Sequence, residues 1–355
     1  RGVSLMMRLP WSPVPLVVAQ GELERAHIIA AALLPAMVSG VAAFTITMFG
    51  APYFIELIRQ LRGGKRIREE LPHHLSKSGV PSMGGFLFTV PVILLTVLYN
   101  LINRYSMLLT VVVLTLSAAL GWVDDRLTTV RIGGEGLRAR FKFTWLLLIA
   151  VAIVAILHIP RLIAPSQQNT VWIPTIGFHS MLAVIYWPLA VLAIVGSANA
   201  VNLTDGLDGL AAGTGAVAFG AFGGIALLQG KLYLGEFCFT MIGALLAFLW
   251  FNVFPARVIM GDTGALALGA TLATVALMLN QMLILPVVGF VFVIETVSVM
   301  LQVSYFRATK GRRIFRASPL HIHLELLGWH ENEVTQRFWI VSMLAGVAGL
   351  ALAFS

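Results

Sequence analysis

Long apolar runs recur along the whole chain, and each has about the length of a membrane-crossing helix. A helix needs roughly 20 residues to cross the hydrocarbon core of a bilayer. Ten runs meet that length, near 27–50, 80–101, 107–123, 143–159, 180–200, 209–228, 235–254, 263–281, 284–305 and 336–354. The ninth contains Pro286 and Glu295, which predicts a break or kink. The pattern predicts an all-α polytopic membrane protein with about ten transmembrane helices.

The composition supports this class. Hydrophobic residues make up 58% of the chain and charged residues only 11%, whereas soluble domains carry about 25% charged residues. Runs of this length indicate helices rather than barrel strands. We therefore expect one integral membrane domain over residues 1–355, with 1–26 as an extracytoplasmic segment that does not resemble a signal peptide. The single cysteine, Cys238, leaves no disulfide framework or thiolate metal cluster.

Basic residues gather on one side of the predicted spans. Segments 59–79, 124–142 and 307–316, together with Arg257, hold 17 of the 24 Lys and Arg residues. Because cytoplasmic loops carry an excess of Lys and Arg, this side is predicted to be cytoplasmic and both termini to lie outside. The net charge of +8 is explained by these loops. We expect no nucleic-acid partner.

All five aspartates fall at cytoplasmic ends of the predicted spans, in three different loops. Solvated loops would scatter carboxylates over both faces, whereas carboxylates that converge among basic residues suggest a site for a metal ion and phosphates. A transport pathway more often places acids at mid-span, and no internal repeat supports a two-halved transporter. The five residues are Asp124, Asp125, Asp205, Asp208 and Asp262.

The richest polar stretch is 199–210, Asn-Ala-Val-Asn-Leu-Thr-Asp-Gly-Leu-Asp-Gly-Leu. If it opens a helix, Asp205 and Asp208 share one face near the first turn. The glycine after each carboxylate leaves room for a ligand to approach the backbone. The alternative is a polar loop in which an Asn or Thr side chain caps a helix.

Two other acidic motifs admit a catalytic and a structural interpretation. Asp124 and Asp125 repel one another unless a cation or proton separates them, which suits an Mg²⁺ or general-base site. A helix end that faces water is the alternative. Asp262, between glycines, could bind Mg²⁺ and leave positions for phosphate oxygens. It could also cap the following helix, and the two roles are compatible.

Two further segments are candidates for phosphate chemistry. His321 and His323 alternate, so they share a face only in an extended or irregular segment, where they could bind metal, orient a phosphate or shuttle protons. Lys77 and Ser82 lie in a glycine-rich segment that suits close approach of a phosphate but lacks the P-loop spacing. A surface loop and a positively charged membrane anchor with a helix cap are the respective alternatives.

Together, the motifs resemble those of the polyprenyl-phosphate N-acetylhexosamine-1-phosphate transferases, and within that superfamily most closely the phospho-N-acetylmuramoyl-pentapeptide transferases. The resemblance runs from about residue 77 to residue 337. It rests on Pro-Ser-Met-Gly-Gly at 81–85, Asp-Asp at 124–125, the stretch 199–210, Phe-Asn-Val-Phe-Pro-Ala at 251–256, Met-Gly-Asp-Thr-Gly at 260–264, and Ser-Pro-Leu-His-Ile-His-Leu-Glu at 318–325 with Gly-Trp at 328–329.

The resemblance implies an Mg²⁺-dependent phosphosugar transferase of the bacterial inner membrane, often a homodimer, with its active site on the cytoplasmic face. Such an enzyme moves phospho-N-acetylmuramoyl-pentapeptide from its UDP-linked donor to undecaprenyl phosphate. It releases UMP and forms lipid I for peptidoglycan synthesis. A direct attack by the lipid phosphate and a two-step path through an aspartyl–phosphosugar both fit these residues.

The resemblance also implies roles for individual residues. Asp262 is expected to be the Mg²⁺ ligand, one of Asp124 and Asp125 the base, and His321 a further member of the catalytic site. The positions expected to bind substrate are Lys77, Ser82, Arg140, Asn199, Asn202, Asp205, Asp208, Asn252, Ile259 and His323.

Five positions depart from the family pattern. Ile322 replaces the middle one of three consecutive histidines, and Ile259 stands where an aromatic residue usually stacks on uracil. Ala265 replaces a usual serine, and Thr128 and Arg140 replace usual lysines. Since amino-sugar relatives also carry His-x-His, transfer of N-acetylglucosamine-1-phosphate to the same lipid is the alternative function. A transporter or flippase is a more distant one.

Overall fold

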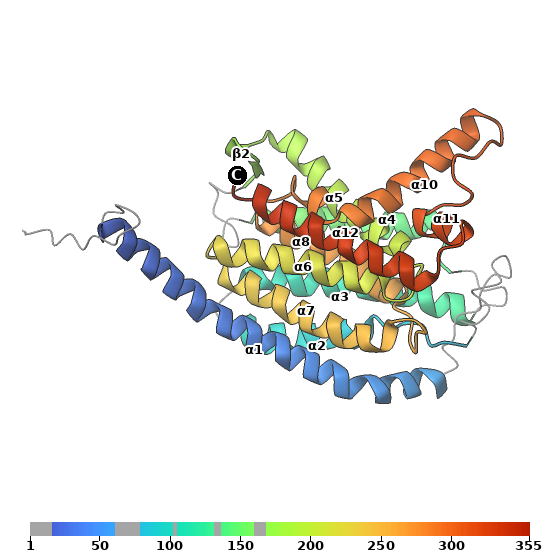
Figure 1. The fold of residues 1–355 in the computed structure, drawn as a ribbon, viewed down its shortest axis with the longest axis horizontal. Coiled ribbons are helices and arrows are strands. Elements are labelled where there is room, and N and C mark those ends of the chain that lie inside the picture. The colour runs from blue at the N-terminus through green and yellow to red at the C-terminus, as the bar shows by residue number, and fades with distance from the viewer. Residues whose placement is uncertain (1–15, 61–78, 102–104, 131–135, 160–167) are drawn as a thin grey trace, which may run out of the picture.

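The computed structural model describes residues 16–60, 79–101, 105–130, 136–159 and 168–355, and it is a bundle of helices with one short hairpin (Figure 1). The α-helices are α1 (Leu16–Gln60), α2 (Phe86–Leu95), α3 (Leu108–Val130), α4 (Ala139–Leu157), α5 (Ala183–Thr204), α6 (Leu210–Leu228), α7 (Leu232–Asn252), α8 (Gly261–Met278), α9 (Leu285–Val288), α10 (Phe290–Ala308), α11 (Leu320–Leu326) and α12 (Glu331–Leu352). A π-helical turn, Thr96–Asn100, continues α2, and a 3-10 turn, Tyr105–Met107, precedes α3.

Within the described ranges, nine helices are long and apolar enough to cross a bilayer, and Phe86–Asn100 is a shorter apolar helix. The predicted class, an all-α polytopic membrane protein, is confirmed. The second predicted span is shorter than expected because residues 81–85 form a loop instead of a helical turn. The predicted break in the ninth span is confirmed: α9 ends at Val288 and α10 begins at Phe290. Residues 16–26, expected to precede the first span, belong to α1.

The centre of the bundle is α8. Its apolar window is 89% buried, against 22% for α1 and 28% for α4 and α10. It packs against α3 and α5 through small residues, and a Cβ on Gly269 would lie only 2.4 Å from the carbonyl oxygen of Ser197 on α5. Small residues let membrane helices approach this closely. The polar loop that precedes α8 is therefore attached to the most tightly packed helix of the protein.

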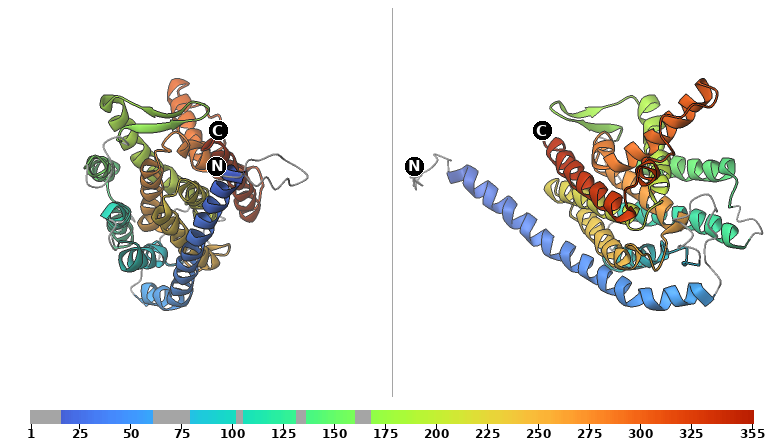
Figure 2. Two further views of the ribbon diagram at one scale, coloured as in Figure 1. Left: turned by 90° about the vertical axis from the view of Figure 1, so that its left-hand side faces the viewer. Right: turned by 45° about the vertical axis from the view of Figure 1, so that its right-hand side comes forward.

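The peripheral helices expose apolar side chains outward, as stable packing against lipid requires. Leu34, Val41 and Phe49 on α1 and Met300 on α10 are examples. Figure 2 shows α1 crossing one side of the bundle, with its N-terminal half extending beyond the other helices. α10 projects away from the bundle in both figures.

The short hairpin was not expected from the hydrophobic pattern. Strands β1 (Thr170–Ile173) and β2 (Gly177–Ser180) pair antiparallel, with Trp172 opposite Phe178. The backbone N–H of Trp172 donates to the carbonyl of Asn280, and its indole N–H donates to that of Leu352. The hairpin, the start of α1 and the C terminus lie at one end of the bundle, and α11 lies at the opposite end (Figure 1).

Candidate active site

Three of the five aspartates accept hydrogen bonds from the backbone of residues 256–263, which run from the α7–α8 loop into the first turn of α8. Asp208 accepts from the N–H of Ala256 at 2.9 Å, and Asp205 accepts from that of Gly261 at 3.1 Å. Asp125, from α3, accepts from the next two backbone N–H groups along the chain. Carboxylates on two other elements thus fix the path of the loop that leads to Asp262. The sequence predicted that these residues converge, but not that they bind one segment of backbone.

Asp125 caps α8 from a neighbouring helix. Its two carboxylate oxygens accept from the backbone N–H groups of Asp262 and Thr263 at 3.1 and 3.0 Å, and the Thr263 hydroxyl donates to it at 2.7 Å. A carboxylate is favoured at a helix N-terminus by the unpaired N–H groups and by the helix dipole. The alternative that Asp262 itself caps α8 is wrong, because the cap residue is Met260 and Asp262 lies inside the first turn.

Asp124 and Asp262 meet at one cation that the sequence analysis did not single out. Lys142, in the first turns of α4, forms an ion pair with Asp262, and its ammonium also lies 3.6 Å from Oδ2 of Asp124. The three side chains are 13–18% exposed, so solutes can reach them. The N–H of Leu137 donates to the other carboxylate oxygen of Asp124. Two acidic side chains and one basic side chain thus form a small accessible cluster at the helix ends.

The stretch 205–209 is a turn and not the start of a helix. α5 ends at Thr204 and α6 begins at Leu210, so the prediction of Asp205 and Asp208 on one helix face is wrong. Gly209 has φ +76°, a conformation that glycine adopts at little cost. Its N–H donates to Oδ1 of Asn252 at 3.1 Å, and the amide of Asn252 donates to the carbonyl of Val258. Asn252 therefore connects this turn to the α7–α8 loop.

The two histidines diverge because they lie on the short helix α11. His321 is 1% exposed, and its ring nitrogen Nδ1 lies 3.0 Å from the carboxylate of Glu295 on α10. The opposite nitrogen, Nε2, faces Gly206, where a Cβ would come within 2.2 Å of it. His323 instead accepts from the backbone N–H of Arg316 at 3.2 Å. The structure brings His321 to the aspartate-rich turn and leaves His323 outside it.

The glycine-rich loop 81–85 supports the α7–α8 loop through the backbone of its two glycines. The N–H groups of Gly84 and Gly85 donate to the carbonyls of Ile259 and Met260, each at 2.9 Å. The hydroxyl of Ser82 is buried and has no hydrogen-bond partner within the described ranges. Ile259 is a half-buried residue of the α7–α8 loop, and its backbone N–H donates to the carbonyl of Pro81. Lys77 lies outside the described residues.

The remaining predicted residues lie at the same end of the helices but make fewer contacts. Arg140 is exposed on the first turn of α4, two residues before Lys142. Asn199 donates to the carbonyl of Val195 in its own helix, and Asn202 is half-buried in the last turn of α5. Their roles stay predictions.

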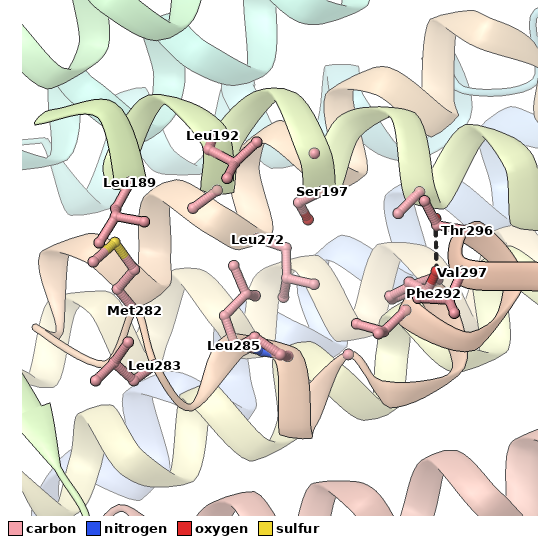
Figure 3. Close-up of a pocket in the computed structure, with 16 residues that line it drawn as sticks. Leu189, Leu192, Ser197, Leu272, Met282, Leu283, Leu285, Phe292, Thr296 and Val297 are labelled. Carbon is pink, nitrogen blue, oxygen red and sulfur yellow. Dashed lines mark hydrogen bonds between the residues drawn. The ribbon is translucent and has the colours of Figure 1, made fainter. Parts of the chain in front are cut away.

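An apolar cavity of about 330 Å³ lies between α5, α8, α9 and α10. Figure 3 shows Leu189 and Leu192 from α5 on one side, and Leu285 and Phe292 from α9 and α10 on the other. Because the chain breaks after α9, α10 leads away from α12 (Figure 1). The cavity lies between α10 and α5. The two helices that carry Asn199 and Glu295 thus also form the walls of an apolar cavity.

Comparison with known proteins gives the family. Residues 106–280 match the family described as Glycosyl transferase family 4. A phospho-N-acetylmuramoyl-pentapeptide-transferase of Chloroflexus aurantiacus is 46% identical over 330 residues, which cover 90% of this chain and 89% of the relative. The chain belongs to the phospho-N-acetylmuramoyl-pentapeptide transferase family. Proteins of the same name from Staphylococcus saprophyticus and Listeria welshimeri are 41% and 38% identical over 318 and 320 residues, covering 89% and 87% of this chain and 98% and 95% of the relatives.

Family membership confirms the resemblance drawn from the motifs and makes the chain a phosphosugar transferase of a membrane. It does not indicate the residues that sequence reasoning missed. Nothing in the sequence distinguishes Lys142 from the other basic residues of its loop. Glu295 was noted only as a polar residue in a kinked span, although it is the partner of His321. Thr263 was seen only as part of a motif, and its hydroxyl binds Asp125.

Proposed function

We propose that the chain transfers phospho-N-acetylmuramoyl-pentapeptide from its UDP-linked donor to undecaprenyl phosphate, releasing UMP and forming lipid I for peptidoglycan synthesis. The observation that carries the proposal is the cluster of Asp124, Lys142 and Asp262, in a chain of this family. A cation between two accessible carboxylates suits a reaction in which charged diphosphates bind and separate. The relatives' names support the identity of the transferred group.

The donor groups of the cluster fit Mg²⁺ bound together with substrate. No set of three or more His, Cys, Asp or Glu side chains that could hold a metal occurs within the described residues. Mg²⁺ is usually held by one or two carboxylates, with water and substrate phosphates in the other positions. Asp262, with Asp124 beside it, provides that number of carboxylates. Bound there, Mg²⁺ would neutralise the diphosphate and stabilise UMP as a leaving group.

The protein side chains then position the reactants. A phosphate oxygen of undecaprenyl phosphate forms the new bond to the sugar-bearing phosphorus, and the bond from that phosphorus to UMP breaks. A phosphate monoester has its second pKa near 6, so the attacking group is largely dianionic at neutral pH without a strong base. Lys142 offsets the charge of the two aspartates. Asp125, Asp205 and Asp208 hold the loop that presents Asp262, which supports in-line orientation of the reactants.

The apolar cavity between α5 and α10 suits the isoprenoid chain of the acceptor. Its lining is almost entirely aliphatic and aromatic, with Ser197 and Thr296 as its hydroxyl-bearing residues. A lipid lying there would remain in the membrane plane while its phosphate reached the helix ends. We extend the proposal to the acceptor's location on this basis.

The site is proposed to face the cytoplasm of a bacterial inner membrane. The exposed basic residues between α10 and α11 lie at the same end of the bundle as the aspartates, as the excess of positive charge in cytoplasmic loops requires. The start of α1 and the C terminus lie at the other end (Figure 1), which fits two termini on the outer side. The homodimer implied by the family is part of the same proposal.

A UMP-release assay tests the substrate assignment. The protein in detergent or nanodiscs is mixed with UDP-N-acetylmuramoyl-pentapeptide or UDP-N-acetylglucosamine, each with and without undecaprenyl phosphate. Release from the muramoyl donor that depends on the lipid and on Mg²⁺ is expected. Release of UMP from UDP-N-acetylglucosamine, but not from the muramoyl donor, would favour the amino-sugar alternative. No release from either donor would overturn the assignment as a transferase of these substrates.

A further inference from the structure

A polar stripe on α12 contacts the aspartate-rich turn. Glu331, Thr335 and Trp339 are spaced four residues apart, so their side chains lie along one face of the helix. Each makes a hydrogen bond to the backbone of Asp208 or Gly209. The stripe begins in the first turn of α12, where a carboxylate is favoured by the helix dipole.

The three hydrogen bonds fix consecutive backbone groups. The carboxylate of Glu331 accepts from the N–H of Asp208 at 2.7 Å, and the hydroxyl of Thr335 donates to the carbonyl of Asp208 at 3.3 Å. The indole N–H of Trp339 donates to the carbonyl of Gly209 at 3.2 Å. The indole packs over Gly213 on α6, where a Cβ would come within 2.1 Å of its nitrogen. A side chain at that position would push the indole away from the turn.

The same helix also anchors the apolar residues of the turn. Leu207 and Leu210 are at most 3% exposed, and they form a small hydrophobic cluster with Val334 and Phe338 of α12 and Val291 of α10. This cluster is separate from the main core of the bundle. The leucines of Asp-Gly-Leu-Asp-Gly-Leu thus pack towards α12, while the carboxylates of Asp205 and Asp208 reach the α7–α8 loop.

We propose that Glu331, Thr335 and Trp339 are positioning residues that set the geometry of the nucleotide-binding turn 205–209. The inference rests on the proposed function and on the expectation, drawn from the family resemblance, that Asp205 and Asp208 bind the UDP-linked donor. The path of contacts runs from α12 through the backbone of Asp208 to its carboxylate and on to the N–H of Ala256. Asp208 binds the loop six residues before Asp262, whose own backbone N–H is bound by Asp125, so the loss of these contacts is expected to act on donor binding more than on the chemical step.

The test compares two substitutions that each remove one hydrogen bond; Thr335→Val keeps the shape of the side chain, whereas Trp339→Phe also reduces its volume. Thr335→Val removes the hydroxyl, and Trp339→Phe removes the indole N–H. Thr335→Ser retains the hydroxyl and serves as the conservative rescue. Thr274→Val is the matched control, since Thr274 is a fully buried threonine of α8 whose hydroxyl donates to Ala270 in its own helix. Steady-state UMP release is measured with donor and lipid varied separately, alongside thermal melting.

We expect Thr335→Val and Trp339→Phe to raise KM for the UDP-linked donor roughly three- to tenfold, the range for loss of one hydrogen bond. The kcat and the KM for the lipid should stay within about twofold of the parent, the pattern for loss of binding shared by ground and transition states. Thr335→Ser and Thr274→Val should retain the parental donor KM.

Other outcomes overturn the inference in different ways. Parental donor KM in both Thr335→Val and Trp339→Phe would show that the stripe does not position the turn, while the proposed function stands. A fall in kcat and in melting temperature together with a rise in both KM values, without rescue in Thr335→Ser, would show a general structural role instead. Failure of the parent to release UMP from any donor would refute the proposed function, and the inference with it.

Discussion

Replacing Asp262 with asparagine is expected to abolish transfer while the protein remains folded. The carboxylate of Asp262 is 15% exposed and pairs with Lys142, whereas the first backbone N–H groups of α8 are bound by Asp125. The substitution therefore removes one negative charge and leaves the cap of the helix in place. An amide oxygen is a far poorer ligand than a carboxylate for a hard cation such as Mg²⁺.

The expected effects of Asp262→Asn on stability and on activity differ greatly in size. After the substitution Lys142 keeps Asp124 as an ionic partner and the repulsion between the two carboxylates is relieved, so the net cost in stability is expected to be only about 1 kcal/mol. In a chain of this length that corresponds to a fall in melting temperature of no more than about 4 °C. Loss of a group that stabilises charge in the transition state costs roughly 3–4 kcal/mol, which lowers kcat roughly 100- to 1,000-fold. Activity should fall by orders of magnitude while the melting curve barely moves.

Asp125→Asn is the contrasting variant. Its carboxylate is 4% exposed and accepts three hydrogen bonds from Asp262 and Thr263, so loss of one acceptor oxygen leaves buried donors poorly paired. Unpaired buried polar groups cost about 1–3 kcal/mol each. Asp125→Asn should lower the melting temperature more than Asp262→Asn does. Turnover of Asp262→Asn within a few-fold of the parent at saturating Mg²⁺ would refute the assignment of Asp262 as metal ligand.

Three further expectations concern other parts of the chain. Ile259→Phe should tighten UMP binding roughly two- to tenfold in calorimetry, because an aromatic contact adds about 0.5–1.5 kcal/mol; unchanged affinity in a folded variant would place Ile259 away from uracil. Burial lowers the pKa of Lys231 to about 8, so the folded state binds fewer protons than the unfolded state between that pH and about 10.4, and stability rises with pH there. The ammonium of Lys231 also donates to the carbonyl of Met278, so the prediction concerns the pH dependence: the melting temperature of Lys231→Met relative to that of the parent should be lower at pH 9.5 than at pH 7.5, and a constant difference would contradict this. A cysteine at exposed Arg257 should react with impermeant maleimide in inside-out vesicles and not in intact cells, and the reverse would invert the proposed orientation.

The hydrophobic pattern alone was sufficient for the class of fold, since the length of an apolar run is a local property that a bilayer selects directly. It also predicted a break in the ninth span, but not its position: Pro286 lies in the first turn of α9, where proline is tolerated, and the break falls at Gly289. The motifs identified the family and gathered the five aspartates at one end of the bundle. These features depend on residues that are close in the sequence, so they can be found without knowledge of how the helices pack.

Which partner each aspartate contacts depends on the tertiary structure. Asp124 and Asp125 are adjacent in the chain, yet one contacts Lys142 and the other caps α8, because successive residues of a helix point in different directions. The partners come from α4 and α8, and the position of α8 is fixed by close packing of small residues. Sequence spacing records which groups are charged but not which backbone N–H or ammonium group each will face. That choice is made only when helices distant in the chain come together.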